Sequence, residues 1–165
     1  NFLRAKLEKE GGGYAATFAK TRLPLSERAV EEAREKGSEL EKYAGEVVVL
    51  GIRPEHIEDA EVAEELDTTS GNVMEVEPQV IESMGSEKYL YFGVGEEQEA
   101  HLQSVSAMTD DEDDEDGGGS PEGSGDLMVA RISPESRAAE GKKVQLALDA
   151  DQIRLFDPNT EDAIL

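Results

Sequence analysis

The segment Val47-Val48-Val49-Leu50-Gly51-Ile52-Arg53-Pro54-Glu55-His56-Ile57 is the most informative part of this chain for its fold. It opens with four apolar residues, three of them β-branched, which predicts a buried strand. Gly51 then interrupts the run, as a glycine does at a bulge or where two backbones come close. Pro54 fixes its own φ and favours an extended Arg53. The strand therefore ends in a rigid charged turn, which is either an ion-paired structural corner or a recognition surface.

The composition limits the classes of partner. The 165 residues include 16 Lys and Arg against 39 Asp and Glu, which gives a formal charge of -23. So acidic a chain is repelled by nucleic-acid backbones and by anionic membranes. It contains no Cys, which excludes disulfides and thiolate metal sites, and no apolar segment approaches the ~20 residues that span a bilayer. We therefore expect no nucleic-acid partner and no direct membrane insertion. Because the chain opens on Asn1 rather than Met, we expect it to be a fragment of a longer protein.

Alternating apolar residues and turn signals predict about eight short strands. Besides the strand at 47–52, they lie at 1–9, 14–23, 72–81, 87–94, 98–108, 126–132, 144–148 and from 151 to the Phe156 region. Pro78 argues for an edge position or a bulge in its strand. In the strand at 144–148, Val144, Leu146 and Leu148 are predicted to face inward and Ala147 outward. This pattern indicates an antiparallel β-barrel or sandwich.

One short helix is predicted over residues 26–36. Ser26 is a favourable N-cap and Gly37 a favourable stop. Glu32 and Lys36 are spaced to form an i,i+4 ion pair. The apolar stripe of this helix is thin, so we expect the helix to lie on the surface.

A strongly acidic insertion occupies residues 109–125. Residues 110–116 are seven consecutive acids, and the segment that follows is rich in Gly and Ser. Such a segment repels itself and predicts a disordered loop. Part of it matches a calcium loop, but position twelve is Gly123 instead of Glu and no amphipathic helices flank it. We interpret the run as a solvated insertion without a specific metal site.

The residues do not form a recognisable catalytic constellation. There is no thiol nucleophile, and the two histidines, His56 and His101, fall in separate segments without a Ser/His/Asp spacing. The triple glycine at 11–13 lacks the following Lys-Ser/Thr of a P-loop, so it predicts a hairpin turn. We expect no catalytic residues, no metal site and no cofactor in this chain.

Residues 50–57 nevertheless resemble the hallmark of the C-terminal regulatory domain of carbohydrate-importing ABC ATPases of the maltose and multiple-sugar type. The segment 155–164 is similar to the closing Phe-Asp-Pro-x-Thr-Gly-x-Ala of that family, with Glu161 in place of the usual Gly. Residues 1–3 resemble the point where the ATPase domain ends, and residues 80–92 resemble a Leu-Gly-x-Glu turn and its following strand. The resemblance covers nearly the whole chain in order, and the acidic segments 58–71 and 109–125 depart from it.

The resemblance implies a transport-associated OB-like domain over residues 1–165: mainly β, an OB-like antiparallel β-barrel with one short surface helix and a disordered acidic loop. The ATPase domain, with ATP and Mg²⁺ as its cofactors, is expected upstream of residue 1. The implied role is to hold two ATPase subunits together as a homodimer and to offer a docking surface for regulatory proteins. Permease subunits are expected to bind through the ATPase domain, at the cytoplasmic face of the cell membrane.

Six residues are predicted to lie at or near functional contacts: Arg53, Pro54, Glu55, His56, Phe156 and Asp157. The alternative for each is architectural, with an Arg–Glu pair closing a barrel corner and a Phe in the core. The competing function is a free-standing small-ligand barrel, of an oxyanion-binding type, or an adaptor module. The charge of -23 and the absence of a basic anion nest near the motif argue against the ligand barrel.

Overall fold

The computed structural model describes residues 1–64, 66, 68, 71–94 and 126–165. These residues form eleven strands, one α-helix and two 3₁₀ helices, and every strand pairing is antiparallel. The predicted mainly-β class with one short helix is confirmed. None of the helices in the described part of the chain is both long and apolar enough to cross a membrane.

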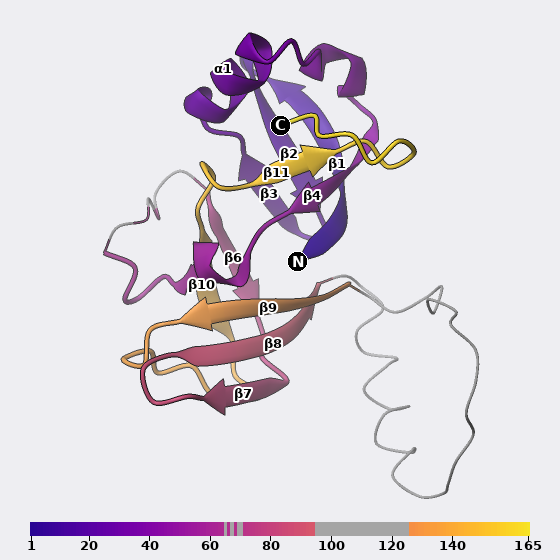
Figure 1. Cartoon of the computed structure of the whole chain (residues 1–165). Coiled ribbons are helices and arrows are strands. Elements are labelled where there is room, and N and C mark those ends of the chain that lie inside the picture. Colours follow the sequence, from indigo (N-terminus) through magenta and orange to yellow (C-terminus); the bar gives the residue numbers. More distant parts are fainter. Residues whose placement is uncertain (65, 67, 69–70, 95–125) are drawn as a thin grey trace, which may run out of the picture.

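The upper lobe in Figure 1 is built on a five-stranded sheet, here called the upper sheet. Its strand order is β11-β4-β1-β2-β3. The strands are β1 (Phe2–Glu10), β2 (Gly13–Phe18), β3 (Thr21–Pro24), β4 (Val47–Gly51) and β11 (Arg154–Phe156). One face of this sheet is buried with α1 (Glu27–Glu35) and the 3₁₀ helix η1 (Leu40–Tyr43) in a common hydrophobic core. Leu7, Val48, Leu50 and Leu155 on that face are fully buried.

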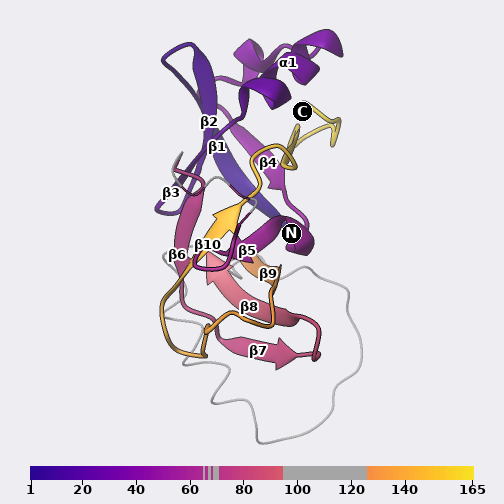
Figure 2. The same cartoon turned by 90° about the vertical axis from the view of Figure 1, so that its left-hand side faces the viewer.

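The lower lobe contains two three-stranded sheets, in the orders β5-β10-β6 and β7-β8-β9. Its elements are the 3₁₀ helix η2 (Pro54–His56), β5 (Ile57–Asp59), β6 (Val73–Val76), β7 (Val80–Ser83), β8 (Lys88–Val94), β9 (Asp126–Ile132) and β10 (Val144–Leu148). The three sheets of the described residues stay open and do not close into one continuous barrel. In the turned view of Figure 2, α1 lies at one end of the molecule and β7 at the other.

The chain passes between the lobes twice, once after β4 and once before β11. The side chain of Asn1 adds a third link, since its amide nitrogen donates to Val129 O (2.8 Å) and its oxygen accepts from Val129 N (2.6 Å). Val129 belongs to β9, an edge strand of the lower lobe. Asn1 therefore binds the edge of β9 in the manner of a neighbouring strand.

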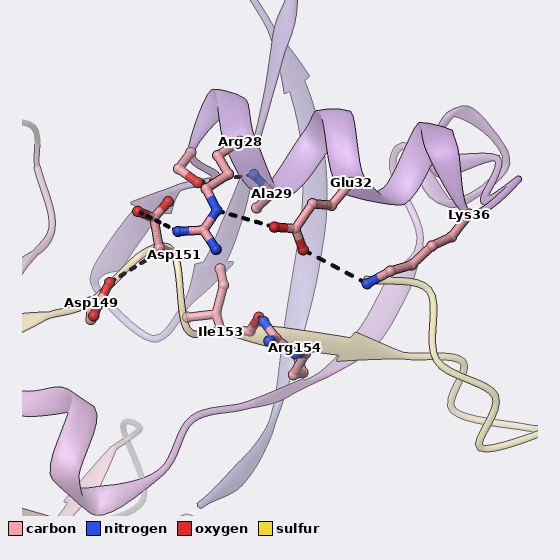
Figure 3. A network of polar contacts seen from close by, with 9 residues as sticks. Arg28, Ala29, Glu32, Lys36, Asp149, Asp151, Ile153 and Arg154 are labelled. Carbon is pink, nitrogen blue, oxygen red and sulfur yellow. Dashed lines mark hydrogen bonds and ion pairs between the residues drawn. The ribbon is translucent and has the colours of Figure 1, made fainter.

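The predicted helix signals are confirmed. Ser26 Oγ accepts from Ala29 N at 3.1 Å, and Gly37 adopts a φ of 77°, which favours glycine. Figure 3 shows a polar network along this helix, in which Glu32 contacts both Arg28 (3.1 Å) and Lys36 (3.7 Å). Arg28 also reaches Asp151 (4.0 Å) in the segment that leads into β11. The network ties α1 to the second crossing between the lobes.

Two of the predicted strands are each divided in the structure. The segment 14–23 forms β2 and β3, separated by a turn in which Ala19 has a φ of 48°. The segment 72–81 divides at Pro78, which is buried, into β6 and β7. Because proline cannot donate a ladder hydrogen bond, the chain leaves one sheet at this point and enters another.

Ala147 is fully buried, contrary to the prediction that it faces outward. Its strand, β10, lies between β5 and β6, so both faces of a central strand are covered. The strand predicted at 98–108 and the whole acidic insertion 109–125 lie outside the described residues, together with the calcium-loop match.

Candidate functional site

The charged turn lies where the chain leaves the upper sheet for the lower lobe. β4 ends at Gly51, and Arg53 follows in an extended conformation (φ −79°, ψ 150°). Pro54 is the first residue of η2, a position that needs no backbone donor. His56 N donates to Arg53 O at 3.0 Å and closes the turn. The sequence thus fixes both the extended entry and the tight 3₁₀ turn.

Backbone hydrogen bonds to two other segments, the N-terminal residue and the segment after β10, hold this turn in place. Ile52 N donates to Asn1 O (3.1 Å), and Asp149 N donates to His56 O (2.9 Å). Asp149 lies in the segment by which the chain returns to the upper sheet. The two crossing segments are therefore hydrogen-bonded to each other at His56, which makes the turn a rigid platform for its side chains.

The side chains of Arg53 and Glu55 are exposed. Among the described residues, neither takes part in an ion pair shorter than 4.0 Å. The Arg–Glu pair that a structural corner would require is thus not formed. His56 is half-buried, and its Nδ1 is enclosed without a hydrogen-bond partner in the described part of the chain.

Positive groups surround the carboxylate of Glu55. Its own backbone N–H holds the pKa of Glu55 below the ordinary value, and the nearby charges of His56, Arg131 and Arg53 act in the same direction. Arg131 comes from β9 and also pairs with Glu87 at 3.3 Å. Because this pKa is lowered, Glu55 is ionised near neutral pH, with the guanidinium groups of Arg53 and Arg131 in its vicinity.

Phe156 lies at the end of β11, the strand that pairs with β4. Its ring packs edge to face against Phe2 of β1, with a centroid distance of 5.9 Å and an interplanar angle of 64°. A Cβ added to Gly51 would lie 3.1 Å from both rings. The register continues through Gly51 on both sides, so it is not a bulge. Gly51 interrupts the apolar run because two aromatic rings close over it.

Asp157 organises the turn that follows β11. Its Oδ1 accepts from Asn159 N (2.7 Å) and Thr160 N (3.1 Å), and its Oδ2 accepts from Tyr43 Oη (3.0 Å). The two backbone donors are the main reason that the pKa of Asp157 lies below its usual value. Glu161, which stands where the resembling motif has Gly, adopts a φ of 62° in this turn. The turn thus keeps the left-handed backbone that a glycine would favour.

The six predicted residues form two groups. The first group is the turn Arg53–His56, whose 3₁₀ helix η2 packs beside β9. The second is Phe156 and Asp157, which contact β1 and η1. Gly51 at the end of β4 lies between the two groups. Sequence reasoning did not identify Phe2, Tyr43 and Arg131 as their partners. One feature of the sequence could have identified Phe2 as a partner: it is an aromatic residue on the otherwise charged face of its predicted strand.

Neither group lines one of the described surface grooves. A polar groove of about 840 Å³ lies beside β5, β6 and β10, and two smaller grooves of about 450 and 380 Å³ flank α1 and η1. Their lining residues do not include Arg53–His56, Phe156 or Asp157. Within the described residues, no group of three His, Asp or Glu side chains is placed to hold a metal ion. The site has the geometry of a surface contact or an architectural junction.

Comparison with known proteins shows what this chain is similar to. Residues 1–57 match the model of the MalK OB fold domain. Over 123 residues, 70% of this chain, it is 31% identical to the trehalose import ATP-binding protein SugC of Mycobacterium tuberculosis, covering 28% of that protein. Over 164 residues, 99% of this chain, it is 27% identical to the trehalose/maltose import ATP-binding protein MalK of Thermococcus litoralis, covering 34% of that protein.

A third relative is the sulfoquinovosyl glycerol transport ATP-binding protein SmoE of Agrobacterium fabrum, 27% identical over 99% of this chain and 33% of its own length. The chain thus spans about a third or less of the length of these relatives. The family match ends at Ile57, where the chain has just crossed between the lobes. The chain carries a MalK-type OB fold domain at its N-terminus and is homologous to the ATP-binding subunits of sugar ABC importers.

Proposed function

We propose that this chain is the regulatory and dimer-forming part of the ATP-binding subunit of a sugar ABC importer. The observation that carries the proposal is the similarity to MalK of Thermococcus litoralis over 99% of the chain, which includes the exposed turn at Arg53–His56. A rigid charged turn that is anchored through its backbone and leaves the side chains of Arg53 and Glu55 exposed suits a contact with a second protein.

The chemistry of the importer would then lie in a different part of the subunit. The sequence of this chain contains no G-x-x-x-x-G-K-[ST] phosphate loop. ATP and Mg²⁺ are therefore assigned to an ATPase domain upstream of residue 1, and this chain is proposed to have no enzymatic activity or cofactor of its own. Permease subunits would be bound through the ATPase domain, at the cytoplasmic face of the membrane.

The mechanism rests on effective concentration. If two regulatory domains remain associated, the attached ATPase domains meet in an intramolecular step each time that they close on nucleotide. Arg53, Glu55 and His56 are proposed to make the contact, and Pro54 keeps their turn rigid. Phe156 and Asp157 are proposed to support it by fixing β11 against β4.

A small-ligand function is the second candidate because of the polar groove of about 840 Å³ in the lower lobe. Arg137, Lys142 and Lys143 line it together with acidic side chains, and Lys143 is already paired with Glu75 at 2.6 Å. Isothermal titration with inorganic phosphate and with sulfate tests this function. Saturable binding that Lys142→Ala abolishes would favour it over the dimer.

The dimer proposal is tested by light scattering on the 165-residue chain over a concentration range up to tens of micromolar. We expect the mass to rise from 17.9 kDa toward twice that value as the concentration increases. A mass that stays at that of the monomer over the whole range would contradict association through this part of the subunit alone.

A further inference from the structure

The side chain of Asn1 uses its whole amide group to join two segments that are far apart in the sequence. Its nitrogen donates to Ile52 O (3.1 Å) and to Val129 O (2.8 Å), and its oxygen accepts from Val129 N (2.6 Å). The backbone oxygen of Asn1 also accepts from Ile52 N at 3.1 Å. Since both hydrogens and the oxygen of the amide have partners, the side chain has one defined placement.

Each of the two segments that Asn1 joins leads to a charged residue of the candidate site. Ile52 is followed directly by Arg53. Val129 and Arg131 are two positions apart in β9, so their side chains lie on the same face of that sheet. The 3₁₀ helix η2 packs beside β9. Asn1 therefore lies where the end of β4 and the edge of β9 meet, next to both arginines in the sequence.

The charges around Glu55 come from two different parts of the fold. The pKa of Glu55 is lowered by its own backbone N–H and then by the charges of His56, Arg131 and Arg53. His56 and Arg53 belong to the same turn as Glu55, so they stay near it in any arrangement of the sheets. Arg131 is in β9, where it pairs with Glu87 at 3.3 Å. Its distance from Glu55 thus depends on how β9 is held against the turn.

We propose that Asn1 is a positioning residue for the contact surface: its amide holds the edge of β9 against the end of β4, so that Arg131 and the Arg53 turn form one continuous surface. The inference rests on the contact role proposed for the turn, and it adds Arg131 to that surface. Asn1 acts through Ile52 and Val129 and is not itself proposed to touch the partner.

An edge strand presents backbone groups that water can also satisfy. If the amide of Asn1 were removed, water could replace its hydrogen bonds to Val129, but water would not fix the position of β9 relative to Ile52. The consequence that matters for the surface is therefore the position of Arg131, and this can be measured separately from stability.

The test compares the full 165-residue chain with Asn1→Ala, Arg131→Ala and the double variant. Gln79→Ala, which removes an exposed amide of the lower lobe, is the matched control. Hydrogen exchange of the Val129 amide in ¹⁵N-labelled protein reports whether β9 is held. NMR titration of the Glu55 carboxyl reports whether Arg131 stays beside the turn. A chain extended by Gly-Ser before Asn1 controls for the charge of the amino group.

We expect Asn1→Ala to accelerate exchange of the Val129 amide by about tenfold, because its acceptor is lost. The pKa of Glu55 should rise, since the charge of Arg131 is no longer held near its carboxylate. Arg131→Ala should raise the same pKa in the wild-type background and change it little in the Asn1→Ala background. Gln79→Ala should leave both readouts unchanged, and the extended chain should behave as the wild type does.

A merely structural role for Asn1 predicts a different result: the free energy of unfolding falls, while Arg131→Ala changes the pKa of Glu55 equally in both backgrounds. That result would overturn the proposal. Unchanged exchange of the Val129 amide in Asn1→Ala, or loss of both effects in the extended chain, would also overturn it. Exchange and titration do not require association, so a wild-type chain that stays monomeric in light scattering contradicts the dimer without affecting either readout.

Discussion

The two groups of the candidate site differ in how the structure uses them. Asp157 receives hydrogen bonds from two backbone amides and from Tyr43, and Phe156 packs on Phe2 over Gly51. The side chains of Arg53 and Glu55 are exposed and form no close ion pair within the described residues, although their backbone is fixed. The sequence predicted one kind of role for both groups, but their surroundings differ. Phe156 and Asp157 are packed and hydrogen-bonded within the upper lobe, whereas the side chains of Arg53 and Glu55 are available for contacts.

The largest expected effect comes from Phe156→Ala. The substitution removes a half-buried ring that covers Gly51, so we expect the free energy of unfolding to fall by about 2 kcal/mol. Phe2→Ala is the matched control, because Phe2 is 68% exposed and should cost less than about 1 kcal/mol. Urea unfolding followed by circular dichroism measures both. Equal costs at the two positions would show that Phe156 is no more structural than its partner.

Gly51→Val should be the next largest effect. A Cβ at this position lies 3.1 Å from two rings, so the added methyl groups must displace at least one of them, at about 1–2 kcal/mol. In a Phe2→Ala background one ring is absent, and the cost should drop. The comparison requires the four unfolding free energies of a double-mutant cycle. Strict additivity would mean that the rings do not set the glycine requirement.

Glu161→Gly is expected to stabilise the protein. Glu161 adopts a φ of 62°, a conformation that costs an L-residue about 1 kcal/mol and glycine very little. We therefore expect a gain of about 0.5–1 kcal/mol in the unfolding experiment. Glu161→Ala removes the same carboxylate but keeps the Cβ, so it should give no such gain. An equal gain for both variants would assign the effect to charge instead of to the backbone.

Asp157→Asn should have a smaller effect that depends on pH. The pKa of Asp157 is lowered in the folded protein, so its ionised form stabilises the fold above the ordinary value of 3.8. That contribution is lost as the pH falls through the folded pKa. The stability difference between wild type and variant should therefore be constant near neutral pH and vanish in acid. A difference that persists in acid would point to altered packing.

Local chemistry in the sequence predicted the parts of the fold that depend on neighbouring residues. The apolar run before Gly51, the Ser26 cap and the Gly37 stop each act within a few positions, and all three are confirmed. The charged turn after β4 also followed from Arg53 and Pro54. Such signals are readable because the residue and the structure that it requires are adjacent in the chain.

The errors arose where distant segments decide the outcome. The residues around Ala19 include no Gly, Pro, Asn or Asp that would indicate a turn, so the sequence did not predict the division between β2 and β3. Ala147 alternates like an outward residue, yet β5 and β6 cover both sides of its strand. The partners of the site, Phe2, Tyr43 and Arg131, are separated from it by long stretches of chain. Their positions depend on how three sheets pack, which a single sequence does not display.

We propose that the Arg53 turn is a contact surface and not a structural corner. The most direct test measures urea unfolding and light scattering together on Arg53→Ala, with Lys20→Ala as an exposed control. We predict that the free energy of unfolding changes by less than about 0.5 kcal/mol, as for an ordinary surface substitution, while self-association weakens by about tenfold. A loss of more than about 1 kcal/mol of stability with unchanged association would contradict the claim and identify the turn as architecture.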